Sequence, residues 1–294
     1  MSRDRFLVGL LGANIAKSLS PALHEDAFDA HGLRGHYHLM DADRIPFRRL
    51  EQALAAVKGL GFAGVNVTFP FKQAVVPLLD EVSADARQIG AVNTVTIDAS
   101  GRTAGFNTDR SGFRRSVEEA FGPAFVAGKR VVLVGAGGAG RAVAFALMDL
   151  KASHVAIHDV DSQRATATVA DLMTHYGAGC CSYAAHLADA IAGAAGVVNA
   201  TPIGMLGMPG NPVPMEAVRQ HHFVADVIYT PMETALIAAA RRKGCQVLTG
   251  GGMCVHQAAD AFRLFTGLEP DVRRMATTFA RALAQRDSAL AKSA

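Results

Sequence analysis

A glycine-rich segment, Gly135-Ala-Gly-Gly-Ala-Gly140, constrains the fold of this chain more than any other feature. It follows an apolar run of strand length, Arg130-Val-Val-Leu-Val134, and precedes a helical pattern from Arg141 to Leu150. The pattern G-x-G-x-x-G between a strand and a helix is typical of the first βαβ unit of a dinucleotide-binding domain. The first glycine permits a tight turn, the second lets the backbone approach a pyrophosphate, and the third lets the helix pack closely on the strand.

The start of this helix favours a pyrophosphate, because its free N–H groups carry a partial positive charge. A glycine-rich turn without a ligand is the alternative, which the flanking strand and helix disfavour. The next expected strand, 154–158, is followed by Asp159, where a carboxylate hydrogen-bonds ribose hydroxyls and repels a 2′-phosphate. Asp159 could instead cap the following helix, a role for which Asp161 is also available.

The only basic residue in the segment after Asp159 is Arg164, one helical turn later. We therefore predict NAD as the cofactor, with NADP as the alternative. The predicted cofactor residues of this region are Gly135, Ala136, Gly137, Gly138, Ala139, Gly140, Asp159 and Arg164.

Short apolar runs alternate with helical patterns along the whole chain, which predicts βαβ units and a mostly parallel, doubly wound sheet. The expected strands are 6–11, 36–40, 64–68, 91–97, 130–134, 154–158, 196–199, 223–228 and 246–248. A helix is expected from Pro46 to Lys58 and another throughout 252–286.

The predicted fold class is α/β with two domains. The first is an N-terminal α/β substrate-binding domain at 1–110. The second is a Rossmann-type, doubly wound, parallel-sheet dinucleotide-binding domain at 111–250. The C-terminal helices, 251–294, are expected to pack back on the first domain.

Composition excludes several classes of function. The net charge of +3 and the lack of a basic run argue against nucleic-acid binding. No apolar stretch approaches the ~18 residues that a transmembrane helix needs, and the run 6–11 is too short for a signal peptide. Four cysteines without a C-x-x-C pair favour a reducing, cytoplasmic setting. His36 and His38 share a strand face but lack a third ligand, so no metal is predicted.

Seven further segments carry polar residues in a specific order. They are 17–21 (K-S-L-S-P), 66–72 (N-V-T-F-P-F-K), 90–94 (G-A-V-N-T), 107–112 (N-T-D-R-S-G), 199–205 (N-A-T-P-I-G-M), 226–229 (D-V-I-Y) and 252–257 (G-M-C-V-H-Q). In this order they resemble the motifs of the shikimate dehydrogenase family, and together they cover nearly the whole chain.

The resemblance implies a role for each motif. It implies that Ser18 and Ser20 bind a substrate carboxylate, and that Lys72 and Asp109 form the catalytic pair. The residues it implies for the ring hydroxyls are Asn66, Thr68, Asn93, Asp109 and Gln257, and Tyr229 joins the substrate residues. Those it implies for the nicotinamide side are Ala200, Thr201, Pro202, Val227 and Gly250.

The chemistry of the residues agrees with these roles. Oxidation of an alcohol moves a hydride to the nicotinamide and a proton to a base, and a lysine can hold that proton when its pKa lies near the working pH. A carboxylate beside Lys72 orients it but also favours the ammonium form, so a proton shuttle and an orienting group both remain open for this residue.

Each of these residues also has an ordinary structural role as its alternative. Ser20 could be an N-cap only, because Pro21 follows it, and Asp109 could cap a helix that begins near Ser111. Lys72 could be a surface lysine at a helix start. Asn66 and Thr68, which share one strand face, could simply face solvent.

Within the family, the resemblance is closest to the NAD-dependent quinate/shikimate dehydrogenases. Asp159-Val160 lacks the Asn-Arg-Thr pattern of NADP-dependent members, and the segments 226–234 and 256–270 resemble the NAD-dependent group. Ser20 favours shikimate, because quinate users can carry Thr there. The expected reaction transfers a hydride between the C3 hydroxyl of shikimate, quinate or both and the nicotinamide.

Two other functions remain as alternatives. One is an NADP-dependent biosynthetic shikimate dehydrogenase, and the other is a catalytically silent dinucleotide-binding sensor, which intact Lys72 and Asp109 disfavour. The methylenetetrahydrofolate dehydrogenases share the architecture but do not explain Ser18-x-Ser20 together with Asp109. The expected partner is a small cyclic hydroxy acid, with no nucleic acid and no membrane, and the oligomeric state is left open.

Overall fold

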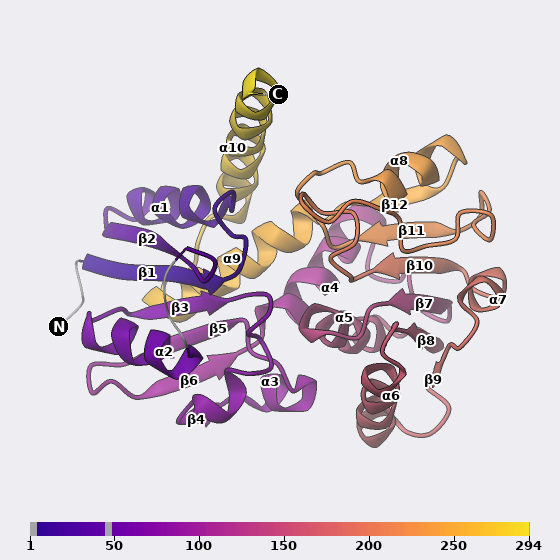
Figure 1. Ribbon diagram of the computed structural model, residues 1–294, viewed down its shortest axis with the longest axis horizontal. Coiled ribbons are helices and arrows are strands. Elements are labelled where there is room, and N and C mark those ends of the chain that lie inside the picture. The colour runs from indigo at the N-terminus through magenta and orange to yellow at the C-terminus, as the bar shows by residue number, and fades with distance from the viewer. Residues whose placement is uncertain (1–4, 45–48, 294) are drawn as a thin grey trace. The chain divides into compact units, whose positions relative to one another are not determined.

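The computed structural model describes residues 5–44 and 49–293 (Figure 1). Contacts along the chain divide it into two compact units. The first unit comprises 1–108 and 255–294, and the second comprises 109–254. Each unit is built on one six-stranded sheet, so the predicted two-domain α/β class is confirmed.

The sheet of the first unit is mixed. Its strands follow the order β2-β1-β3-β5-β6-β4. They are β1 (Arg5–Gly12), β2 (Arg34–Asp41), β3 (Gly64–Val67), β4 (Glu81–Val82), β5 (Thr94–Ile97) and β6 (Thr103–Phe106). Strands β2, β1 and β3 are parallel, whereas β5 is antiparallel to both β3 and β6. Strands β5 and β6 are antiparallel because a hairpin joins them, and its turn contains Gly101 at φ +81°, a conformation that favours glycine.

Helices cover this sheet and complete the unit. They are α1 (Ser20–Ala30), α2 (Leu50–Gly59), the 3₁₀ turn η1 (Val76–Leu78), α3 (Ala84–Ile89), α9 (Gly251–Thr266), which belongs to this unit from Val255 onward, and α10 (Val272–Ser293). The expected start of α2 at Pro46 lies outside the described residues. The continuous helix expected over 252–286 is wrong, because Gly267 at φ +76° separates α9 from α10.

The two faces of the first sheet bury different side chains. Because neighbouring residues on a strand point to opposite faces, Leu10 and Leu11 of β1 enter separate hydrophobic clusters. The Leu11 cluster includes residues of α2, and the Leu10 cluster includes Phe28 of α1 and Phe262 of α9. Helix α10 lies against α1 (Figure 1), where Arg274 and Asp26 form an ion pair at 2.9 Å.

The sheet of the second unit is parallel throughout, in the order β12-β11-β10-β7-β8-β9. Its strands are β7 (Arg130–Val134), β8 (His154–His158), β9 (Cys181–Tyr183), β10 (Gly196–Asn199), β11 (Phe223–Asp226) and β12 (Gln246–Leu248). Its helices are α4 (Thr108–Phe121), α5 (Gly138–Asp149), α6 (Ser162–Tyr176), α7 (Leu187–Ala192) and α8 (Ala235–Arg242). The strand order reverses between β7 and β10, which is the doubly wound arrangement that the sequence predicts.

Candidate active site

The glycine loop lies at the carboxyl end of β7, where the strand order reverses. Gly135 has φ +101°, and a Cβ at this position would lie 2.9 Å from backbone atoms of Ala200. A Cβ at Gly140 would overlap the carbonyl oxygen of Gly135, whereas one at Gly137 would meet nothing within 4 Å. The first and third glycines are therefore required for packing, and the second leaves open space beside the loop.

Helix α5 begins directly from this loop with its N-terminus available. Its N-cap is Gly137, and no side chain accepts a hydrogen bond there. The first N–H groups of a helix carry partial positive charge and bind anions well. The loop and helix start therefore fit a pyrophosphate.

Asp159 is buried at the end of β8 and is held by the backbone. Its Oδ2 accepts a hydrogen bond from Ala136 N at 2.7 Å, and its Oδ1 accepts one from Asp161 N at 2.8 Å. Each carboxylate oxygen still has lone-pair capacity for a ribose hydroxyl. Asp161 is the N-cap of α6, accepting from Gln163 N at 3.0 Å, so the alternative that Asp159 caps this helix is wrong.

Arg164 does not stand free beside this carboxylate. Its Nε lies 2.9 Å from Asp161 Oδ2, and its side chain is half exposed. A guanidinium that is already paired with a carboxylate is a weaker attraction for a 2′-phosphate.

The loops after β10 and β11 are tied together by a buried polar cluster that the sequence analysis missed. Asn199 Nδ2 donates to Asp226 Oδ1 at 3.1 Å, and its Oδ1 accepts from Thr201 N at 2.9 Å. Asp226 also accepts from Ile228 N at 3.0 Å and from Thr234 Oγ1 at 2.7 Å. Burial raises the pKa of Asp226 to about 6. The signal available in the sequence was a polar residue ending each of two apolar strands.

This cluster positions the residues expected on the nicotinamide side. Ala200–Pro202 follow Asn199 directly, and Val227 follows Asp226. A Cβ at Gly250 would overlap the carbonyl oxygen of Val227, so this glycine permits a close approach of two loops. Tyr229, from the same segment as Val227, is half-buried.

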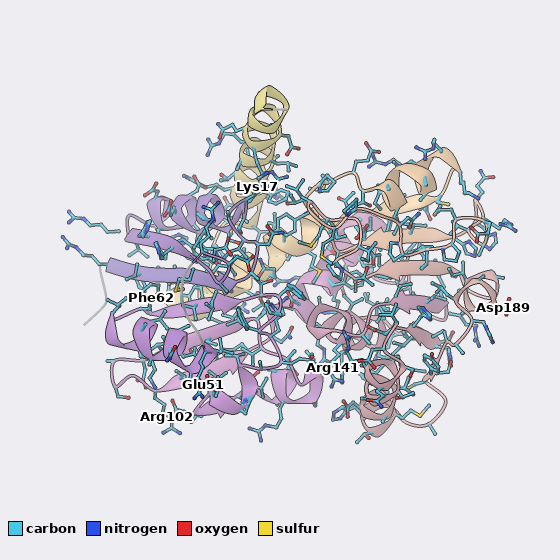
Figure 2. All side chains as sticks on the ribbon, in the orientation of Figure 1. Lys17, Glu51, Phe62, Arg102, Arg141 and Asp189 are labelled. Atoms are coloured by element: carbon cyan, nitrogen blue, oxygen red, sulfur yellow. The ribbon has the colours of Figure 1, made fainter. Side chains whose placement is uncertain are left out.

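Ser18 and Ser20 lie together at the start of α1 in the first unit. Ser18 Oγ donates to Ser20 Oγ at 3.1 Å and accepts from Ser20 N at 3.2 Å. The N-cap of α1 is Leu19, and no side chain caps this helix, so the alternative of Ser20 as an N-cap is wrong. Lys17, labelled in Figure 2, is exposed, whereas Ser20 is buried.

Asn66 lies in the middle of the first sheet and is buried, which contradicts the alternative that it faces solvent. Its Oδ1 accepts from the Tyr37 hydroxyl at 2.8 Å. Its Nδ2 donates to Asn93 O at 3.2 Å and to Thr94 Oγ1 at 2.9 Å. Thr68, on the same side of the chain two residues later, is half-buried.

A second amide, that of Asn93, anchors the segment that leads into α4. Asn93 Nδ2 donates to Thr108 Oγ1 at 2.9 Å, and Asn93 Oδ1 accepts from Thr108 N at 2.8 Å. Asp109 follows directly and is buried in the first turn of α4, which begins at Thr108. A helix start near Ser111 with Asp109 as its cap is therefore wrong. Asn107 Nδ2 supports the same segment by donating to Ala91 O at 2.9 Å.

Lys72 lies in the turn between β3 and η1 and is half-buried. Its carbonyl oxygen accepts from Val92 N at 2.8 Å, which ties this turn to the segment before Asn93. The helix that follows begins only at Val76, so the alternative of an exposed lysine at a helix start is wrong. Gln257 is half-buried on α9.

The structure thus divides the predicted site residues between the two units. Those in the first unit are Ser18, Ser20, Asn66, Thr68, Lys72, Asn93 and Gln257. Asp109, Tyr229 and all predicted cofactor residues belong to the second. Hydrogen bonds connect Ser18 with Ser20, Asn66 with Asn93, and the glycine loop with Asp159.

Three general features of the chain complete the description. Among the residues described, no three His, Cys, Asp or Glu side chains are grouped so that they could hold a metal ion. Nor does any helix within 5–44 and 49–293 combine the length and apolar character needed to cross a membrane. None of the four cysteines, Cys180, Cys181, Cys245 and Cys254, which all lie within the described residues, is in a disulfide bond.

Comparison with known proteins identifies the family. Residues 10–95 match the shikimate dehydrogenase substrate binding domain, and residues 250–278 match the shikimate 5'-dehydrogenase C-terminal domain. A quinate/shikimate dehydrogenase (NAD(+)) from Corynebacterium efficiens is 47% identical over 287 residues, covering 95% of this chain and 99% of that protein. A shikimate dehydrogenase (NADP(+)) from Streptomyces avermitilis is 46% identical, covering 94% and 95%.

A solved structure gives the same result. Quinate dehydrogenase from Corynebacterium glutamicum in complex with NAD superposes with a TM-score of 0.86 at 46% identity, covering 94% of this chain and 99% of that one. Both sequence and fold are shared along nearly the whole length. The chain belongs to the shikimate dehydrogenase family.

Proposed function

We propose that this protein is an NAD-dependent oxidoreductase that transfers a hydride between the C3 hydroxyl of shikimate, quinate or both and the nicotinamide. The products of oxidation are 3-dehydroshikimate and 3-dehydroquinate. The observation that carries the choice of cofactor is the carboxylate of Asp159, which two backbone N–H groups fix beside the glycine loop. The C. efficiens and C. glutamicum relatives, described with NAD, support the same choice.

The residues of the second unit fit the parts of NAD in turn. The N–H groups of the glycine loop and of α5 would hold the pyrophosphate, and Asp159 would accept hydrogen bonds from the adenosine ribose. We assign Ala200–Pro202, Val227 and Gly250 to the nicotinamide side. When bound, the nicotinamide supplies the hydride acceptor or donor.

The residues of the first unit would bind and orient the acid. The hydroxyl oxygens of Ser18 and Ser20 lie 3.1 Å apart, close enough to serve one carboxylate together. We assign the ring hydroxyls to a polar set of half-buried and buried side chains. This set comprises Asn66, Thr68, Asn93, Asp109 and Gln257, and we assign Tyr229 to the substrate as well.

We assign Lys72 and Asp109 as the catalytic pair, with proton transfer at Lys72. The Nζ of Lys72 would take the proton of the reacting hydroxyl during oxidation and return it during reduction. The carboxylate of Asp109 would accept a hydrogen bond from the substrate and orient it. Both side chains are held on anchored backbone, Lys72 through Val92 and Asp109 through the preceding Thr108.

The test is a set of initial rates with purified protein, offering shikimate and quinate each with NAD and with NADP. We expect turnover with NAD on at least one acid and little with NADP. Preference for NADP would overturn the NAD assignment and identify an NADP-dependent biosynthetic shikimate dehydrogenase. Tight NAD binding without turnover of either acid would identify a silent sensor.

The variant Asp159→Ser tests the residue that carries the cofactor assignment. Loss of the carboxylate removes ribose hydrogen bonds and the repulsion of a 2′-phosphate, so the NAD/NADP ratio of kcat/KM should fall by at least about tenfold. Asp189→Ser is the matched control, because Asp189 is an exposed carboxylate in the same unit (Figure 2). An equal fall in both variants would reduce the effect to net charge and contradict the assignment.

We also propose that the protein works in the cytoplasm. Four cysteines without a disulfide agree with a reducing compartment.

A further inference from the structure

Two stacked aromatic rings lie buried in the first unit, and one of them contacts Asn66. His24 of α1 is fully buried and stacks on Tyr37 of β2, with ring centroids 4.6 Å apart and an interplanar angle of 20°. The rings of Phe262 and Phe265 of α9 lie at 6.4 Å and 5.9 Å from that of His24. Neither nitrogen of His24 has a hydrogen-bond partner, so its ring contributes packing and no polar contact.

Tyr37 itself is buried, and its hydroxyl contacts the amide of Asn66. Its hydroxyl donates to Asn66 Oδ1 at 2.8 Å. The two hydrogens of Asn66 Nδ2 are donated to Asn93 O and Thr94 Oγ1, at 3.2 Å and 2.9 Å. A flipped amide would place its oxygen against the carbonyl oxygen of Asn93, which has no hydrogen to donate. The amide therefore has one orientation.

This orientation limits what Asn66 can offer to a ligand. Both of its N–H hydrogens are used within the protein, and one of the two lone pairs on Oδ1 is used by Tyr37. One lone pair of Oδ1 remains. Asn66 can therefore accept a hydrogen bond from a ligand, but it cannot donate one without giving up a buried internal bond, which costs about 1–3 kcal/mol.

We propose that Tyr37 is a positioning residue for the substrate: it fixes Asn66 as a pure hydrogen-bond acceptor that selects a ring hydroxyl over a keto, ether or fluoro group. His24 stacks on the phenol ring and supports it as a neutral, apolar platform. The inference rests on the proposed function, because it takes Asn66 to contact the ring of the acid. It adds the residue that sets the polarity of that contact.

The first experiment compares Tyr37→Phe, which removes only the hydroxyl, with the wild-type enzyme. Without its donor, Asn66 is less firmly held, so KM for the acid should rise by about tenfold, equivalent to about 1.4 kcal/mol. KM for NAD and kcat should change by less than about twofold. Tyr176→Phe is the matched control, since it removes a hydroxyl that donates to Asp149 at 2.9 Å in the second unit. It should leave KM for the acid unchanged.

The second experiment varies the substrate. Shikimate analogues in which one non-reacting ring hydroxyl is replaced by fluorine keep an acceptor but lose the donor. One such analogue should lose about tenfold in kcat/KM with the wild-type enzyme. The loss should be clearly smaller with Tyr37→Phe, because the contact is already weakened there.

A third variant, His24→Phe, tests whether His24 acts only as an aromatic platform for Tyr37 or also carries a proton in the reaction. It keeps an aromatic platform, so KM for the acid and the pH–rate profile should match the wild type within about twofold. A lost or shifted limb of the pH–rate profile would mean that His24 carries a proton in the reaction and would overturn its role as a neutral platform.

The outcomes distinguish this inference from the proposed function. An active wild-type enzyme whose KM for the acid is unaltered by Tyr37→Phe, with only a lower Tm, would reduce Tyr37 to a structural residue and overturn the inference alone. A fall in kcat together with a rise in KM for NAD would overturn it as well, because the effect would not be specific to the acid. A wild-type protein inactive on both acids would overturn the proposed function and this inference together.

Discussion

The buried histidine of α1 should make the folded protein sensitive to acid, and His24→Phe should remove that sensitivity. Burial lowers the pKa of His24 from 6.5 to about 3. Between these two values the unfolded chain binds a proton at His24 and the folded chain does not. The free energy of unfolding therefore rises with pH in this window. The contribution of His24 to the free energy of unfolding is therefore fully present above pH 6.5 and is lost as the pH falls towards 3.

The size of the effect follows from the distance between the two pKa values. A pH of 5 lies about 1.5 units below the pKa of the histidine in the unfolded chain, and each unit is worth about 1.4 kcal/mol. Protonation of His24 in the unfolded chain should therefore lower the free energy of unfolding at pH 5 by about 2 kcal/mol relative to pH 7.5. In His24→Phe this loss should be absent. The larger ring also changes packing, but that change does not depend on pH and cancels when two pH values are compared.

Urea unfolding at pH 5.0, 6.0 and 7.5 measures this difference directly. The control is His38→Phe, because His38 is an exposed histidine of the same unit. Its unfolding free energy should follow the wild type at every pH. If the free energies of unfolding of wild type and His24→Phe changed with pH by the same amount, within about 0.5 kcal/mol, His24 would have to take up a proton or water in the folded state. The reasoning from burial would then be refuted.

Three further variants test other parts of the structure. Because burial raises the pKa of Asp226 from 3.8 to about 6, its stabilising contribution is complete below pH 4 and is lost as the pH rises through 6. Asp226→Asn should therefore raise the free energy of unfolding at pH 8 by up to about 3 kcal/mol, and with it Tm, but should raise neither at pH 4. A rise in Tm of equal size at both pH values in thermal scans would contradict this. Gly140→Ala places a methyl group where it overlaps the carbonyl oxygen of Gly135, so in steady-state kinetics KM for NAD should rise at least about tenfold while KM for the acid stays nearly constant. An unaltered KM for NAD would show that the loop can shift to accommodate the methyl group. Lys72→Met should lower kcat by at least about 100-fold, while the Kd for NAD measured by calorimetry stays within about twofold of the wild-type value. A smaller loss of kcat would favour an orienting role for the lysine.

The features that follow from neighbouring residues could be predicted from the sequence alone. The strand, glycine loop and helix from Arg130 to Asp149 form where the pattern places them, because their hydrogen bonds and turns are local. Asp161 caps α6 because a carboxylate can reach the N–H groups two and three residues later. The hairpin turn at Gly101 has the same local origin. Short elements such as β9 and α7 were missed, since three to six residues carry too little periodicity.

The partners of the buried polar groups could not be predicted in this way. Asn66 meets Tyr37 across 29 residues, and Asn199 meets Asp226 across 27. In each case the two residues lie on different strands, and strand order and register decide which side chains meet. The sequence therefore determined the class of fold, the glycine loop and the candidate site residues, because these depend on spacing along the chain. Only the tertiary structure decided that Asn66 is an acceptor, that His24 remains neutral and that Asp226 holds two loops, because hydrogen-bond partners and burial depend on distances in space.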